Sequence, residues 1–173
     1  MRARKELGQH FLHDSGILSR IAAASGAGPN DVVLEIGPGP GGLTGALLDT
    51  GATVVAIERD PRMASVLSRQ FTGRDFVLVE GDALQMDWAP LVAPWKHLGR
   101  QWRVVGNIPY YITSPLIDRA LQQPMPVSIT YLVQREVARR LVAQPGGKEF
   151  GALTIGVGAV AAVTVPLEVG RGA

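Results

Sequence analysis

The sequence predicts a doubly wound α/β fold built on a mostly parallel sheet. Runs rich in Val and Ile alternate along the chain with helical patterns, and the connections between them are short. The apolar runs are nearly continuous, which is typical of strands that are buried on both faces. Strand–helix alternation of this kind favours an open parallel sheet, and ligands of such sheets bind beyond the carboxyl ends of the strands.

Six strands and five helices are expected. The strands are the apolar runs at Val32–Ile36, Thr53–Glu58, Phe76–Glu80, Trp102–Gly106, Ser128–Val133 and, near the end of the sequence, Val160–Val165 or slightly later. The helices are expected at Ser15–Ser25, Leu43–Thr50, Pro61–Gln70, Pro115–Gln122 and Arg135–Ala143. Pro61 and Pro115 each stand where a first-turn proline is tolerated.

The composition narrows the class of protein. A chain of 173 residues suits one domain, and the absence of Cys excludes disulfides, zinc–thiolate sites and a Cys nucleophile. It also fits a reducing compartment, so we expect a cytoplasmic protein. Arginines make up fourteen of the seventeen cationic residues; they suit bidentate phosphate contacts, but a general compositional bias explains them equally well.

Two segments bear on whether the chain carries a targeting signal or a membrane span. The charged N-terminus is not followed by an apolar stretch of the kind found in signal peptides. The uncharged segment Phe150–Leu167 approaches spanning length. Its glycines and Pro166 favour a buried helix followed by a strand.

A glycine-rich loop follows the first expected strand. Gly37, Gly39 and Gly42 match the pattern G-x-G-x-x-G between a strand and a helix, and Glu58 ends the second strand nineteen residues after Gly39. A carboxylate at that place can accept both ribose hydroxyls of an adenosine-containing cofactor. The alternative is a glycine turn that only lets the helix pack closely on the strand.

Prolines in this loop discriminate between cofactors. A dinucleotide pyrophosphate needs backbone N–H donors, and Pro38 and Pro40 each remove one. S-adenosylmethionine has no phosphate to hold, so it suits a loop with Glu35 and two prolines better than NAD does. Asp82, after the third strand, is placed to accept from the adenine amino group, although a turn or helix-cap aspartate would look the same.

The most specific motif follows the fourth strand, at Asn107-Ile108-Pro109-Tyr110. The exocyclic amine of adenine is a poor nucleophile, because its lone pair is delocalised into the ring. The Asn107 side-chain oxygen and the Pro109 carbonyl could accept its two N–H bonds, and Tyr110 could stack a base taken out of its stack. Positioning and electrostatics then lower the barrier without a strong base. A proline–aromatic turn that only packs the strand end is the alternative.

With these motifs, the chain resembles the small-subunit ribosomal RNA adenine dimethyltransferases. Their relatives include the erythromycin-resistance methyltransferases and mitochondrial transcription factor B. Further matching segments are Gly8–Leu12, Gly81–Ala83, Gln134–Leu141 and Pro145–Leu153. Pro38 and the Pro145–Leu153 stretch look like the housekeeping ribosomal branch.

The resemblance implies a site and a substrate. His10 and Leu12 would close over the methionine end of the cofactor, and Gly37, Glu58, Asp82 and Asn107 would form the rest of its site. Two neighbouring adenosines near the 3′ end of the RNA in the immature small subunit would each be dimethylated. The resemblance implies neither a metal ion nor a membrane partner. The family often has Asn where His10 stands, so charge there would depend on pH.

The resemblance also implies more chain than is present. Family members continue beyond Ala173 with a last strand and a small helical domain, so we expect residues 1–173 to be an incomplete catalytic domain of a protein that is monomeric at full length. By the same resemblance, the missing last strand would lie between the fifth and sixth strands.

Three other functions stay open. A nucleotide-dependent oxidoreductase is supported only by the glycine loop and Glu58. A large-subunit methyltransferase of the macrolide-resistance type, or a non-enzymatic RNA-binding assembly factor, would share the fold. The basic residues Arg135, Arg139 and Arg140, and the arm of Arg2, Arg4 and Lys5, suit either RNA contacts or a solvated surface.

Overall fold

A computed structural model describes residues 12–170. Its strands are β1 (Asp31–Ile36), β2 (Thr53–Glu58), β3 (Phe76–Glu80), β4 (Gln101–Asn107) and β5 (Ser128–Leu132). Its helices are α1 (Ser15–Ala24), α2 (Gly42–Leu48), α3 (Pro61–Gln70), α4 (Ala89–Lys96), α5 (Thr113–Ala120), α6 (Arg135–Leu141) and α7 (Ala152–Gly158), with a short 3₁₀ helix, η2 (Tyr110–Ile112).

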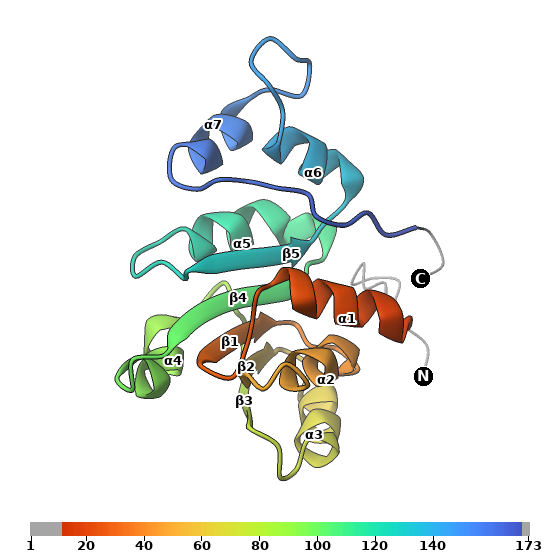
Figure 1. Ribbon diagram of the computed structural model, residues 1–173, viewed down its shortest axis with the longest axis vertical. Helices are drawn as coiled ribbons and strands as arrows, with labels where there is room; N and C mark the ends of the chain where they lie inside the picture. The colour runs from red at the N-terminus through yellow and green to blue at the C-terminus, as the bar shows by residue number, and fades with distance from the viewer. Residues whose placement is uncertain (1–11, 171–173) are drawn as a thin grey trace.

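The five strands form one parallel sheet in the order β3-β2-β1-β4-β5. The chain builds outward from β1 to β3 and then returns to the other side of β1 to place β4 and β5 (Figure 1). The order therefore reverses between β1 and β4. Polypeptide leaving the carboxyl ends of these two strands diverges to opposite faces, which opens a crevice at that edge.

Helices cover both faces of the sheet. On one face, α1, α2 and α3 bury Leu18, Leu47 and Leu67 against the sheet. On the other face, α4 and α5 bury Val92 and Leu116. All six residues of β1 and all six of β2 are buried, as central strands of a three-layer structure should be.

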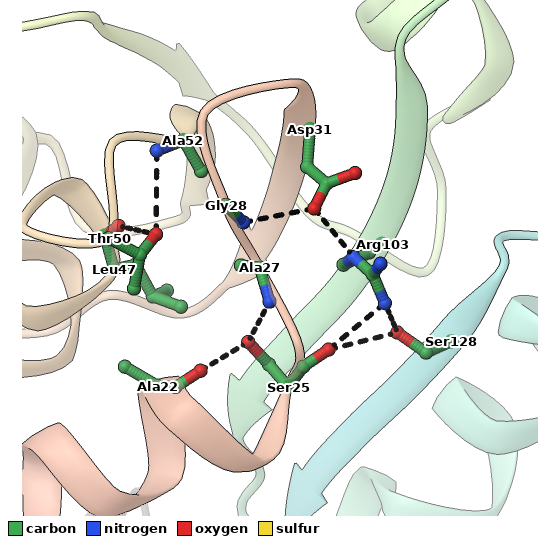
Figure 2. Close-up of polar contacts among 10 residues, drawn as sticks. All are labelled: Ala22, Ser25, Ala27, Gly28, Asp31, Leu47, Thr50, Ala52, Arg103 and Ser128. Carbon is green, nitrogen blue, oxygen red and sulfur yellow. Dashed lines mark hydrogen bonds and ion pairs between the residues drawn. The ribbon is translucent and has the colours of Figure 1, made fainter.

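A polar cluster joins the strands at their amino ends, opposite the crevice. Figure 2 shows Arg103 of β4 reaching Asp31 of β1, the carbonyl of Ser25 and the hydroxyl of Ser128 on β5. The Arg103 Nε donates to Asp31 Oδ2 at 3.0 Å, and one guanidinium nitrogen donates to Ser25 O at 3.2 Å and to Ser128 Oγ at 3.0 Å. The cluster ties three strands and the end of α1 together.

Helices α6 and α7 lie beyond β5, at the end of the molecule (Figure 1). The segment that follows α7 runs back beside β5, and the two enclose an apolar groove of about 570 Å³ together with α5 and α6. Within residues 12–170, β5 pairs with β4 alone, so its other edge is unpaired. No helix in the described part of the chain is long and apolar enough to cross a membrane.

The expectation of a sixth strand at Val160–Val165 is wrong. The segment Phe150–Leu167 begins with a helix, α7, as expected, but the residues after it form neither helix nor strand. The backbone N–H groups of Val160 and Ala161 donate to the carbonyl of Val157 and complete the end of α7. Pro166 has no N–H to donate, and a strand forms only where a partner accepts its hydrogen bonds.

One helix, α4, was not expected. Pro90 and Pro94 both lie in it, and proline is a poor helix former. Its buried face, with Val92 and the adjacent Trp88, outweighs that preference. The five helices expected between Ser15 and Ala143 all form, each shifted by no more than two residues at either end. In α5, Pro115 is the third helical residue, where its missing N–H still costs no helical bond.

Candidate active site

A pocket of about 190 Å³ opens where the strand order reverses, at the carboxyl ends of β1 and β4. The glycine loop forms one wall, and the segment after β4 forms another. Leu12, Leu18 and Ile21 close the pocket from the α1 side, and Val133 and Gln134 close it beyond β5. The structure therefore brings Leu12, Gly37, Asn107, Pro109 and Tyr110 of the predicted site into one pocket.

The conformation of the glycine loop explains its residue types. Gly37, Gly39 and Gly41 have positive φ values of 66°, 55° and 85°, which other residues rarely adopt. A Cβ atom on Gly41 would meet Leu67 and Phe71 at 2.8 Å, so this glycine is needed for packing. A Cβ atom on Gly37 would meet nothing within 4 Å, so this glycine borders open space in the pocket.

Glu35 lies in the pocket wall. From the sequence it counts in favour of S-adenosylmethionine, but it is not among the predicted cofactor-binding residues. Its side chain is 1% exposed, and its Oε2 accepts a hydrogen bond from Thr44 Oγ1 at 2.7 Å. Its Oε1 is the one buried side-chain polar atom in the described residues that has no hydrogen-bond partner. Burial, reinforced by the charge of Glu58, raises the pKa of Glu35 to about 8 against the lowering effect of Thr44. Its position directly before the loop was the available signal.

Glu58 is joined to the glycine loop by a hydrogen bond. The side chain is 4% exposed; Oε2 accepts the N–H of Gly39 at 3.3 Å, and Oε1 accepts the N–H of Asp60 at 2.8 Å. Each carboxylate oxygen has a second lone pair for a ligand. Glu58 supports the loop from behind and is not part of the pocket lining.

Asp82 lies one strand further out, after β3, and also outside the pocket lining. Its Oδ1 accepts the N–H of Leu84 at 3.0 Å, which is the turn role considered for it. Its Oδ2 lies 3.8 Å from the guanidinium of Arg59, the residue after Glu58. The carboxylate is partly exposed and remains accessible to a ligand. His10 lies outside the described residues, as do Arg2, Arg4 and Lys5.

The segment after β4 forms a rigid turn at the pocket mouth. Ile108 is buried, and its N–H donates to the carbonyl of Leu132 at 3.1 Å. Pro109 then leads into η2. The ring of Tyr110 lies in the pocket wall and is 57% exposed.

Hydrogen bonds hold the Pro109 carbonyl in place. It accepts the N–H of Ile112 at 3.2 Å and the hydroxyl of Thr113 at 3.1 Å. These two bonds occupy both lone pairs, so a third donor would share this oxygen or displace the Thr113 hydroxyl. Thr113 is buried and was not identified from the sequence, although a threonine four residues after a turn residue often bonds back to it.

The described residues contain no group of three or more His, Cys, Asp and Glu side chains that could hold a metal ion. The basic face of α6 contains one ion pair, between Arg135 and Glu168 at 3.7 Å. Arg139 and Arg140 are exposed.

Known proteins are similar to this chain in sequence and in fold. The family model for ribosomal RNA adenine dimethylase matches residues 1–172. The ribosomal RNA small subunit methyltransferase A of Deinococcus radiodurans is 48% identical over 154 residues, which cover 89% of this chain and 50% of that protein. A crystal structure of a dimethyladenosine transferase from Plasmodium falciparum is 34% identical, with a TM-score of 0.72, over 86% of this chain and 52% of that one. The 23S rRNA methyltransferase ErmE is 34% identical, with a TM-score of 0.65, over 76% of this chain and 50% of that one.

The parallel sheet, with the glycine loop after β1 and the Asn107–Tyr110 turn after β4, has the fold of the RNA methyltransferases that these two crystal structures represent. The chain belongs to the ribosomal RNA adenine dimethylase family. It spans about half the length of these relatives.

Proposed function

We propose that residues 1–173 form the catalytic domain of a methyltransferase that transfers methyl groups from S-adenosylmethionine to the exocyclic amines of two neighbouring adenosines in small-subunit ribosomal RNA. One observation carries this proposal: the glycine loop after β1 and the Asn107–Tyr110 turn after β4 line the same pocket. A cofactor held by the loop and a base held by the turn would meet there.

The residues of the loop fit S-adenosylmethionine. Glu35 Oε1 is buried in the pocket wall without a hydrogen-bond partner. The ammonium group of the cofactor's methionine part is a donor of matching charge, and it would favour the ionised form of Glu35. Leu12 would cover this end of the cofactor together with His10. Glu58 would accept from the ribose hydroxyls and Asp82 from the adenine amine, while Gly37 leaves room for the ligand.

The cofactor supplies a methyl group on a positively charged sulfur, and the protein must hold the amine in line with it. Asn107 and the Pro109 carbonyl would each accept a hydrogen bond from the amine, which would displace the Thr113 hydroxyl from the Pro109 oxygen. The lone pair of the amine then stays directed at the methyl group. Tyr110 would stack the base, since its exposed ring borders the pocket. As the nitrogen–carbon bond forms and the sulfur–carbon bond breaks, the amine becomes acidic and its proton would pass to solvent, so these groups act by orientation and electrostatics.

The names of the relatives favour the small ribosomal subunit as the substrate, because the Deinococcus protein bears that name at 48% identity. The similarity to ErmE, at 34%, keeps large-subunit RNA as the second candidate. Asn107, Pro109 and Tyr110 together argue against a purely structural assembly factor. We place the activity in the cytoplasm, on immature subunits, with the full-length protein as a monomer.

Methyl transfer from labelled S-adenosylmethionine tests this function directly. The chain should label small subunits that lack the modification and leave large-subunit RNA unlabelled. Label in large-subunit RNA alone would assign the chain to the macrolide-resistance type of methyltransferase instead. Absence of label from both, with the cofactor bound, would contradict the proposed activity of these residues.

A further inference from the structure

Two consecutive tyrosines stand apart from the other aromatic residues. In the described part of the chain, Tyr110 and Tyr111 are the only aromatic side chains that are exposed, at 57% and 50%. Burial of an aromatic ring is strongly favourable, and exposed aromatic groups at the rim of a pocket are typical of interaction sites. Tyr110 has a role in the proposed function, whereas Tyr111 has none.

The two rings are nearly perpendicular. Their centroids are 5.9 Å apart, and their planes meet at 85°, an edge-to-face pair. Such a contact covers a face of one ring only, and both side chains remain about half exposed. The pair therefore offers free ring faces in two directions about a right angle apart.

The turn holds this arrangement rigidly. Successive side chains of a 3₁₀ helix diverge by about 120°, so Tyr110 can line the pocket while Tyr111 lies outside the lining. The turn is fixed at its far end by Ile112, which packs against the buried core, and by the hydrogen bond from Thr113 to Pro109. These contacts fix the backbone position from which the Tyr111 side chain projects.

We propose that Tyr111 stacks the base next to the target adenosine in a single-stranded segment of RNA. This inference rests on the proposed function. A base that enters the pocket must leave the stack of its neighbour, and the neighbour then has an exposed face. A second aromatic ring, turned by a right angle from the first, covers that face. Aromatic stacking accepts any base, so it would serve when either of two adjacent adenosines occupies the pocket.

The test uses a short single-stranded RNA with 2-aminopurine beside the target adenosine, because stacking on an aromatic ring quenches its fluorescence. The full chain and its Tyr111→Phe variant should quench this probe. Tyr111→Ala should leave it bright and bind the RNA roughly tenfold more weakly. Leu98→Ala, which changes an exposed apolar side chain just before β4, at the other end of that strand from the turn, is the matched control.

A second RNA, with an abasic nucleotide beside the target, separates stacking from misfolding. The wild-type chain and Tyr111→Ala should bind it equally, whereas a folding defect would weaken both complexes of the variant. Equal quenching of the flanking probe by wild type and Tyr111→Ala would overturn the inference. If wild type labels small subunits but shows no such quenching, the proposed function stands and this inference alone fails.

Discussion

At the scale of single residues, Glu35 combines full burial with an oxygen that has no partner. Burial raises its pKa from 4.5 to about 8, so the folded protein holds a proton there that the unfolded chain releases near pH 4.5. The contribution of this proton to stability is complete below that pH. It is lost as the pH rises through the folded pKa.

We therefore expect Glu35→Gln to flatten the pH dependence of stability. Between pH 5 and pH 8 the free energy of unfolding of the wild type should fall by a few kcal/mol, on the order expected for a shift of this size, relative to the variant, because Gln stays neutral. Urea denaturation across this range measures the difference. Parallel curves for the two proteins would show that Glu35 does not titrate as its burial implies.

Tyr110 acts, in our proposal, through its ring and not through its hydroxyl. Tyr110→Phe should change the single-turnover rate only slightly. Tyr110→Ala should lower it by roughly tenfold or more, since stacking on an aromatic ring contributes about 1–3 kcal/mol per base. If Phe were as damaging as Ala, the hydroxyl would be the functional group and the stacking role would be wrong.

At the scale of elements, the amino edge of the sheet depends on Arg103. The ion pair with Asp31 is largely buried, with side chains 17% and 10% exposed. Arg103→Met should destabilise the protein by about 3 kcal/mol, because it leaves a nearly buried carboxylate without its cation. Arg74→Met is the matched control, since Arg74 and Asp49 are paired on the surface and such pairs contribute about 0–1 kcal/mol. Chemical denaturation compares them.

Cofactor affinity of the folded Arg103→Met protein should equal that of the wild type, because the cluster and the pocket lie at opposite ends of the strands. A loss of affinity in a fully folded variant would show that the cluster at the amino ends of the strands is coupled to the pocket at their carboxyl ends.

The sequence predicted the elements whose own residues specify them. The five parallel strands, Pro61 at the start of α3, and the glycine loop follow from local patterns, and each strand agrees within one residue at either end. The prediction of a sixth strand failed because a strand depends on a partner elsewhere, and within residues 12–170 the segment after Val160 pairs with no strand. The sequence does not predict α4, because the stability of this helix comes from packing and not from its proline-containing sequence.

The site shows the same division. Asn107, Pro109 and Tyr110 could be identified because they form one contiguous motif. The unpartnered oxygen of Glu35 could not, since it results from burial between neighbouring elements. The hydrogen bond from Thr113 to Pro109 could not be identified either. The same holds outside the site for the contacts of Arg103 with Asp31 and Ser128, because these residues lie far apart in the sequence.

At the scale of the whole molecule, the unpaired edge of β5 faces an apolar groove of about 570 Å³. A strand edge that pairs with no other strand in residues 12–170 invites pairing with another chain. We expect the chain to self-associate as its concentration rises, and Thr130→Lys on β5 to reduce the association, with Thr72→Lys as a surface control. Size-exclusion chromatography with light scattering measures this. A monodisperse monomer at all concentrations would show that the segment after α7 protects the edge.

The chemistry assigned to the pocket is tested most directly by mass spectrometry of nucleosides from methylated small-subunit RNA. We expect the chain to produce adenosine carrying two methyl groups on its exocyclic amine, at two neighbouring positions. Asn107→Ala should bind the cofactor but form this product roughly a hundredfold more slowly, as expected when one preorganised polar group is removed. Methyl groups on ribose or on another base, or an Asn107→Ala protein as fast as wild type, would contradict the assignment.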